Sequence, residues 1–111
     1  MTIFQQIIDK KIPANIVYED EWVLGFHDIA PQAPVHVLFI PKIPVENFLE
    51  ASCENGLMQR LFDAIHEYVK KAGLNRDQIR LVTNCGALAG QSVFHFHIHL
   101  LSGRNFSWPP G

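Results

Sequence analysis

The spacing of hydrophobic residues along this chain predicts helices in two places. Apolar positions three and four residues apart indicate a short helix from Ile3 to Ile8 and a long helix whose apolar face runs from Leu57 to Ala72. Thr2, followed three residues later by Gln5, fits a capping box at the start of the first helix. Ser52 is expected as the N-cap of the second helix.

Five shorter apolar runs, bounded by turn residues, predict strands. Their ranges are Ile16 to Glu19, Trp22 to His27, Val35 to Ile40, Ile79 to Asn84 and Val93 to Leu101. The helices are not spaced as crossovers between successive strands. We therefore expect an α+β fold, with a five-stranded, mostly antiparallel sheet, one long helix and one short helix. The length of 111 residues fits a single domain that spans residues 1–111.

Composition and charge exclude several classes of protein. A hydrophobic share of 48% is typical of a globular chain. The formal net charge of -2 and the scattered Lys and Arg residues argue against a nucleic acid as the main partner. We expect no membrane partner, because no apolar stretch approaches the roughly 18 residues of a membrane span, and no basic leader precedes one. Cys53 and Cys85 form no CxxC pair and are expected to be reduced thiols in a cytoplasmic protein.

The most informative cluster consists of His95, His97 and His99, three of the six histidines in the chain. Because successive side chains on a strand point to opposite faces, the three imidazoles are expected on one face and the apolar residues between them on the other. Neighbouring imidazoles on such a face lie roughly 6–7 Å apart. The pattern therefore predicts a row of ionisable rings on one surface.

The residues alone leave three interpretations of this row open. A polar sheet face in water is one, although Thr, Lys or Glu would serve that purpose better. A zinc site is another, since His-x-His spacing can bring two imidazoles to one ion and His36 could add a third, but no Asp, Glu or Cys lies within the cluster. The third is nucleophilic catalysis. Neutral imidazole attacks phosphorus near neutral pH, and the labile P–N bond divides a difficult displacement into two easier steps.

The same residues also resemble a known family. The run from His95 to Leu101 matches the alternating histidine and apolar pattern of the histidine triad (HIT) family. The segment from Phe26 to His36 resembles the stretch before the family's third strand, and Gly90 to Phe94 resembles its phosphate loop. The ending from Gly103 to Gly111 looks like the Hint branch, the histidine triad nucleotide-binding proteins. The resemblance covers nearly the whole chain.

This resemblance implies an activity and an assembly. Hint members are homodimers that hydrolyse nucleoside phosphoramidates, which are purine nucleotide conjugates, through a covalent nucleotidyl-histidine intermediate and without a metal or another cofactor. His97 would be the nucleophile, and His99 would bond the phosphate and assist the leaving group. His36 would steady the nucleophile from the neighbouring strand, His95 would support it, and Ser92 would contact the phosphate.

The resemblance also implies which residues hold the nucleotide. Asp28 would accept hydrogen bonds from the ribose hydroxyls, as suits a carboxylate. Ser92 and Asn84, with backbone groups of Gly90 and Gln91, would hold the phosphate and leaving-group side. The base pocket would be lined by Ile3, Phe4, Ile7, Phe26, His27 and Ile29.

Two positions depart from the family's pattern, and two other functions remain open. Cys85 stands where members often carry an acidic or polar residue, and Ala89 stands where they often carry glycine. These departures bear on loop flexibility and leaving-group preference, not on the reaction class. The alternative functions are a non-catalytic nucleotide-binding or scaffolding protein and a zinc hydrolase that uses His36 with the triad.

Overall fold

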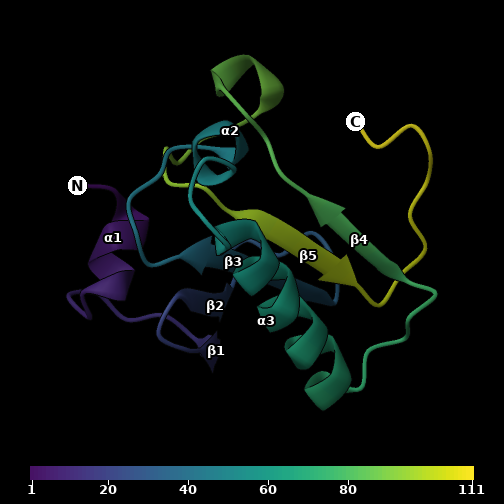
Figure 1. Cartoon of the computed structure of the whole chain (residues 1–111). Helices are drawn as coiled ribbons and strands as arrows, with labels where there is room; N and C mark the ends of the chain where they lie inside the picture. Colours follow the sequence, from purple (N-terminus) through teal and green to yellow (C-terminus); the bar gives the residue numbers. More distant parts are fainter.

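The centre of the fold is a five-stranded sheet in which every neighbouring pair of strands is antiparallel. A computed structural model describes all of residues 1–111. The strand order is β1-β2-β3-β5-β4 (Figure 1). The strands are β1 (Ile16–Glu19), β2 (Val23–His27), β3 (Val35–Pro41), β4 (Ile79–Val82) and β5 (Ile98–Ser102). This arrangement confirms the predicted α+β fold, and the observed sheet is antiparallel throughout.

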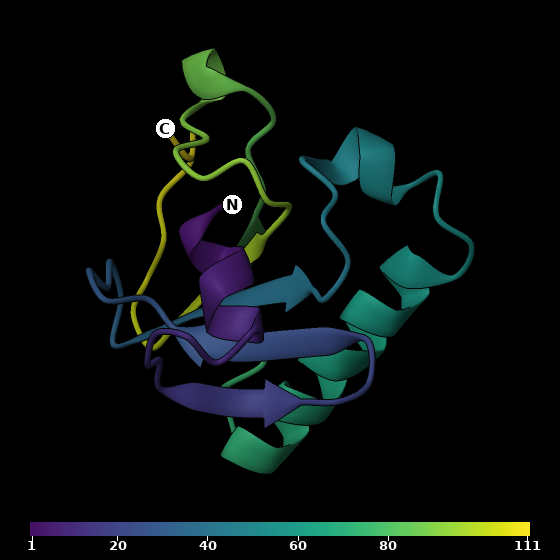
Figure 2. The ribbon, with the colours of Figure 1, turned by 90° about the vertical axis from the view of Figure 1, so that its left-hand side faces the viewer.

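Two helices pack on opposite faces of the sheet. α3 (Leu57–Ala72) covers the face that carries Phe39, Ile98 and Leu100, and it crosses this face diagonally in Figure 1. α1 (Ile3–Ile8) lies over β2 and β3 on the other face, where Phe4 and Ile7 enter a smaller apolar cluster (Figure 2). α1 therefore lies on the same face as His95 and His97, which its residue Phe4 contacts. The apolar residues Phe96 and Ile98 enter the larger core on the opposite face.

The start of the long helix differs from the prediction. α3 begins at Leu57, and Ser52 is not its N-cap. Ser52 instead ends α2 (Phe48–Ala51), a one-turn helix that the hydrophobic pattern does not predict. The Asn47 side chain caps α2 by accepting from the backbone amides of its first turn. The prediction is wrong because a helix this short leaves no periodic signal, so its C-terminal serine resembled the start of the next helix.

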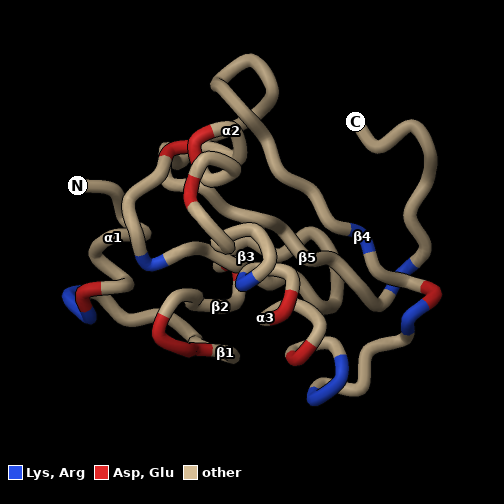
Figure 3. Tube along the Cα trace, in the orientation of Figure 1, with Lys and Arg blue, Asp and Glu red and all other residues tan.

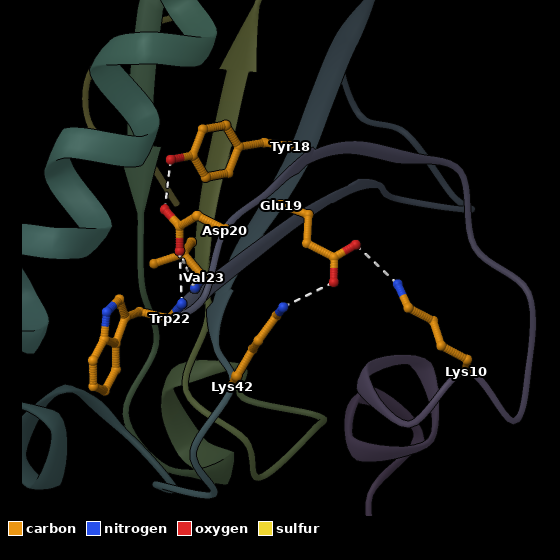
Figure 4. A network of polar contacts seen from close by, with 7 residues as sticks. All are labelled: Lys10, Tyr18, Glu19, Asp20, Trp22, Val23 and Lys42. Atoms are coloured by element: carbon orange, nitrogen blue, oxygen red, sulfur yellow. Dashed lines mark hydrogen bonds and ion pairs between the residues drawn. The ribbon is translucent and has the colours of Figure 1, made fainter.

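The predicted N-cap of α1 is confirmed, but the predicted capping box is not complete. Thr2 is its N-cap, and Thr2 Oγ1 accepts a hydrogen bond of 3.1 Å from the Gln5 backbone amide. The reciprocal bond of a capping box is absent, because Oε1 of Gln5 has no hydrogen-bond partner, and Nε2 of Gln5 donates to Asp9. After α1, an ion pair of 3.0 Å joins Lys10 to Glu19 of β1 (Figure 4). Glu19 also pairs with Lys42, and the two lysines hold the pKa of Glu19 below its usual value, Lys42 most strongly. These contacts fix the end of α1 against the sheet.

The last strand is shorter than predicted, and this difference shapes the site. β5 begins at Ile98 and not at Val93, because the ladder with β3 ends at Ile98 and the ladder with β4 ends at His99. The Thr83 hydroxyl donates to the carbonyl oxygen of His97 at 2.8 Å, where a longer β4 would have paired. β4 accordingly ends at Val82, two residues before its predicted end. His95 and His97 therefore lie on an irregular segment that leads into the strand.

The turn between β1 and β2 is closed by a side chain. The Asp20 carboxylate accepts from the backbone amides of Trp22 and Val23 (Figure 4). Acidic and basic residues alternate over the surface without a continuous basic face (Figure 3). No helix has the length and hydrophobicity that crossing a bilayer requires.

Candidate active site

A pocket of about 640 Å³ lies between α1 and the sheet. Every residue that the resemblance assigned to the base pocket lines it: Ile3, Phe4, Ile7, Phe26, His27 and Ile29. Its polar part is formed by Asp28, Ser92, His97 and His99. The pocket therefore joins an apolar compartment to a cluster of ionisable and hydroxyl groups.

Part of the wall was missed by sequence reasoning. Residues Ile12 to Asn15, which connect α1 to β1, also line the pocket. Nothing in their composition marks them as ligand-binding. They reach the pocket because the backbone carbonyl of Asn15 accepts from His27 and so places the connection beside β2. Asn15 is a polar group at an otherwise apolar end.

The remaining predicted site residues do not line the pocket. His36 and His95 are buried, and each shares a hydrogen bond with a lining histidine, His36 with His99 and His95 with His97. Gly90 has a φ of 96°, a conformation that favours glycine, and its Cα faces the Asn84 amide. Gln91 is buried and makes hydrogen bonds with its side chain. These positions support the lining residues and do not form the pocket wall.

A hydrogen bond to the backbone defines the tautomer of His97, which lines the pocket. Its Nδ1 lies 2.8 Å from the backbone carbonyl oxygen of His95. Because a carbonyl oxygen only accepts, Nδ1 carries the hydrogen, and the lone pair of the neutral ring is on Nε2. The Phe4 ring packs edge-on against the imidazole, with 5.0 Å between ring centroids. Burial lowers the pKa of His97, which favours the neutral ring that nucleophilic attack requires.

A second chain of hydrogen bonds defines the protonation of His99. The Gln32 backbone amide donates to Nδ1 of His36 at 3.0 Å, so the hydrogen of the neutral His36 ring is on Nε2. This Nε2 lies 2.9 Å from Nδ1 of His99, which accepts and leaves the hydrogen of His99 on its own Nε2. Burial, together with the nearby His97 and His36, lowers the pKa of His99 to about 4. His99 is therefore neutral with an N–H to donate.

A carboxylate does lie at the histidine cluster, contrary to the expectation from sequence. Asp28 Oδ2 is 3.5 Å from Nε2 of His36, and Asp28 Oδ1 accepts from the Ala30 amide at 2.8 Å. Its charge raises the pKa values of His36, His97 and His99 and partly offsets the effect of burial. The sequence held a signal for this contact. Asp28 follows the end of β2, and the antiparallel pairing of β2 with β3 brings that end beside His36.

The triad's first histidine has a supporting position. His95 is 2% exposed, and its Nε2 donates to the carbonyl oxygen of Pro41 at 2.8 Å. Burial lowers its pKa, so this ring is also neutral. Since the backbone carbonyl of His95 is the acceptor for His97, anchoring this residue also anchors the group that sets the tautomer of His97. His95 therefore does not line the pocket and contacts His97 through its backbone carbonyl oxygen.

The side chains of Asp28, His36 and His99 also raise the question of a metal. One potential ligand atom from each lies within 4.8 Å of the other two. However, the Gln32 amide already occupies the lone pair on Nδ1 of His36, so Nε2 carries the hydrogen and offers no lone pair to a cation. In metal sites the second nitrogen of a histidine usually donates to an acceptor, which is the opposite arrangement. The residues present therefore do not fit a metal ion.

Comparisons with known proteins show the family to which this chain belongs. Residues 9–106 match the HIT domain family model. The chain is 50% identical over 111 residues to an uncharacterized HIT-like protein of Synechococcus elongatus, with 99% of this chain and 96% of the relative covered. It is 52% identical over 111 residues to another of Synechocystis, with the same coverage. The chain therefore belongs to the HIT domain family.

Solved structures of the family share the whole fold. A HIT family hydrolase from Legionella pneumophila is 38% identical, has a TM-score of 0.93, and is covered over 100% of both chains. A HIT family hydrolase from Clostridium thermocellum is 41% identical, with a TM-score of 0.89 and coverage of 96% of this chain and 93% of the other. The chain thus has the fold of HIT family hydrolases.

Proposed function

We propose that this protein is a Hint-type hydrolase of nucleoside phosphoramidates and forms a covalent nucleotidyl intermediate on His97. The observation that carries the proposal is the hydrogen bond from Nδ1 of His97 to the carbonyl of His95, because it leaves an unprotonated Nε2 on a residue that lines the pocket. A purine fits the apolar part of this pocket, and the phosphate fits beside Ser92 and the histidines.

The first step transfers the nucleotidyl group to the protein. Nε2 of His97 attacks the α-phosphorus, and a P–N bond to His97 forms as the bond from phosphorus to the leaving amine breaks. The Nε2–H of His99 donates a hydrogen bond to a phosphate oxygen, and the departing nitrogen takes a proton from solvent and leaves as a neutral amine. The nucleotidylated His97 ring is cationic, and its Nδ1–H remains bonded to the carbonyl of His95. The charge of Asp28 favours this cation.

The second step returns the protein to its starting state. Water attacks the phosphorus and releases one proton to solvent, while the Nε2–H of His99 keeps its hydrogen bond to the phosphate. The P–N bond to His97 breaks, its electron pair returns to Nε2 of His97, and a nucleoside monophosphate leaves. His36 does not touch the reacting atoms in this scheme. It holds Nδ1 of His99 as an acceptor, so that the ring hydrogen of His99 is on Nε2 and can bond the phosphate.

Two experimental conditions test the function. Adenosine phosphoramidate is incubated with the protein, with and without a chelator, and release of adenosine monophosphate is measured. We expect turnover under both conditions, because the tautomer of His36 opposes metal binding. Loss of activity in chelator and its recovery with zinc would favour the zinc hydrolase, whereas nucleotide binding without turnover would favour the non-catalytic binding protein.

Location and assembly are also part of the proposal. Cys53 and Cys85 are free thiols, which supports the reducing cytoplasm as the location. A homodimer is proposed because β4 is an edge strand with an unpaired side. A purine nucleotide conjugate and a second copy of the chain are therefore the expected partners.

A further inference from the structure

The irregular segment before β5 is held by one buried amide side chain. Gln91 is 4% exposed and uses both hydrogens of its amide. Its Nε2 donates to the carbonyl oxygen of Glu46 at 2.6 Å and to that of Val93 at 3.1 Å. Its Oε1 accepts from the backbone amide of Gly86 at 2.8 Å. A single side chain therefore connects both ends of the loop from Gly86 to Val93 with the segment that follows β3.

Backbone hydrogen bonds join the same segments of the chain. The Gln91 amide donates to the carbonyl of Gly86 at 3.1 Å, so the two residues are joined by a reciprocal pair. Further along, the Phe96 amide donates to the carbonyl of Val45 at 2.7 Å. The segment from Pro41 to Glu46 thus supports the nucleophile's stretch through His95, Phe96 and Gln91. Of these three residues, only Gln91 precedes Ser92 in the sequence, and its side chain joins this part of the loop to Glu46.

We infer that the Gln91 side chain is a positioning residue for the reaction, since it sets the place of Ser92 and of the loop amides relative to His97. The inference rests on the proposed function and concerns a residue that does not line the pocket. Ser92 is exposed and belongs to no helix or strand. It lies between Gln91 and Val93, whose carbonyl oxygen accepts from the Gln91 side chain. A displacement of about 1 Å at such a position can lower a rate by about 10²-fold.

Two substitutions separate this role from packing. Gln91→Glu keeps the shape but replaces the donating amide with an acceptor that faces the Glu46 and Val93 carbonyl oxygens. Gln91→Met keeps similar bulk and removes all three bonds without adding a charge. The matched controls are Gln59→Glu and Gln59→Met on the exposed side of α3, where Gln59 makes one side-chain bond to Asp63.

The decisive measurement is the rate of adduct formation in a rapid-quench experiment, compared with the affinity for adenosine monophosphate. We expect both Gln91 variants to form the adduct about 10²-fold more slowly, while affinity falls much less, because the base and ribose contacts lie elsewhere. A merely structural role would lower rate and affinity together through the unfolded fraction. Normal adduct formation in Gln91→Met, or parallel loss of rate and affinity in both folded variants, would overturn the inference.

A second measurement keeps this inference distinct from the proposed function. If the wild-type protein does not hydrolyse adenosine phosphoramidate, the proposed function is wrong, and the positioning claim is judged by NMR. Adenosine monophosphate should then shift the Ser92 amide resonance in the wild type and in both Gln59 variants, but much less in Gln91→Met. Equal shifts in the wild type and Gln91→Met would overturn the positioning claim by itself.

Discussion

Nε2 of His36 lies 2.9 Å from Nδ1 of His99, and this contact makes a residue on β3 responsible for the protonation of a residue on β5. The Gln32 amide fixes one nitrogen of His36, so the direction of the hydrogen bond between the rings is also fixed. His99 is left with its hydrogen on Nε2, and His99 lines the pocket. The hydrogen-bond donor that the proposed reaction uses for the phosphate therefore depends on the backbone amide of Gln32.

Replacement of the nucleophile is the first prediction. His97→Ala should abolish turnover and leave nucleotide binding largely intact, because the base and ribose contacts lie on other elements. Rapid quench of the wild type with labelled substrate should show an adduct that is stable to base and labile to acid, as a P–N bond requires. His66→Ala, on the exposed side of α3, serves as the control. Near-normal turnover by His97→Ala, or label on Ser92, would contradict the mechanism.

Loss of the tautomer contact should slow the reaction without stopping it. His36→Ala and His99→Ala should each lower kcat by a factor on the order of 10²–10⁴, the range for a positioned acid–base group. The double variant should lose little more than His99→Ala alone, because the two rings act through one hydrogen bond. Steady-state kinetics of the wild type, the two single variants and the double variant give the double-mutant cycle. Fully additive losses would show that His36 acts independently of His99.

The ribose prediction concerns Asp28. A carboxylate that bonds both ribose hydroxyls should favour ribonucleotides, so Asp28→Ala should weaken binding of adenosine monophosphate more than binding of its 2′-deoxy analogue. Calorimetric titration of both ligands measures the difference. Asp28 Oδ1 also accepts from Ala30 and its Oδ2 faces His36, so equal losses for the two ligands would assign it to the loop and the histidines.

Stability should fall as the solution becomes mildly acidic. In the folded chain, burial lowers the pKa values of His36, His95 and His97, and it lowers the pKa of His99 from its usual 6.5 to about 4. Between pH 6.5 and about 4 the unfolded chain therefore binds more protons, and the free energy of unfolding falls as pH decreases through this window. Urea unfolding at several pH values measures the trend. His99→Gln should reduce it, and a constant midpoint between pH 7 and pH 5 would argue against buried neutral histidines.

The edge of the sheet leads to a prediction about assembly. β4 pairs only with β5, its residue Leu81 is 38% exposed, and Trp108 near the C-terminus is 82% exposed. We expect a homodimer at micromolar concentration, in which such apolar surface is covered. Light scattering gives the mass, and Leu81→Lys should shift it toward the monomer, whereas Lys70→Glu on α3 should not. A monomer as the only species of the wild type would contradict the prediction.

The sequence predicted the side-chain pattern of the site better than the backbone that carries it. Alternation placed Phe96, Ile98 and Leu100 in the core and the histidines on the other face, as observed. The pattern could not reveal that the strand begins only at Ile98, because the competing bonds come from residues distant in sequence, such as Val45 and Thr83. Periodicity records which face a residue occupies and carries no information about its hydrogen-bond partner.

The same distinction explains the other differences. α2 could not be predicted from periodicity because it has a single turn, although Asn47 followed by Glu50 contains a capping signal. The approach of Asp28 to His36 requires the pairing of β2 with β3, which the resemblance implied only at the level of the fold. The tautomers of His36, His97 and His99 depend on hydrogen bonds to backbone atoms, and the sequence alone does not show these bonds.

The early end of the β5 ladder has a consequence for the chemistry of anions. Within a regular interior strand, the backbone N–H and C=O groups form hydrogen bonds with the two neighbouring strands, and none remains free to bind a ligand. Ahead of Ile98 the chain leaves that register, and the amides around Ser92 are released from the ladder while Gln91 and Phe96 hold the backbone in place. Because the ladder ends here, ordered N–H groups are available to a phosphate. If β5 began at Val93, those N–H groups would form hydrogen bonds with the neighbouring strands instead.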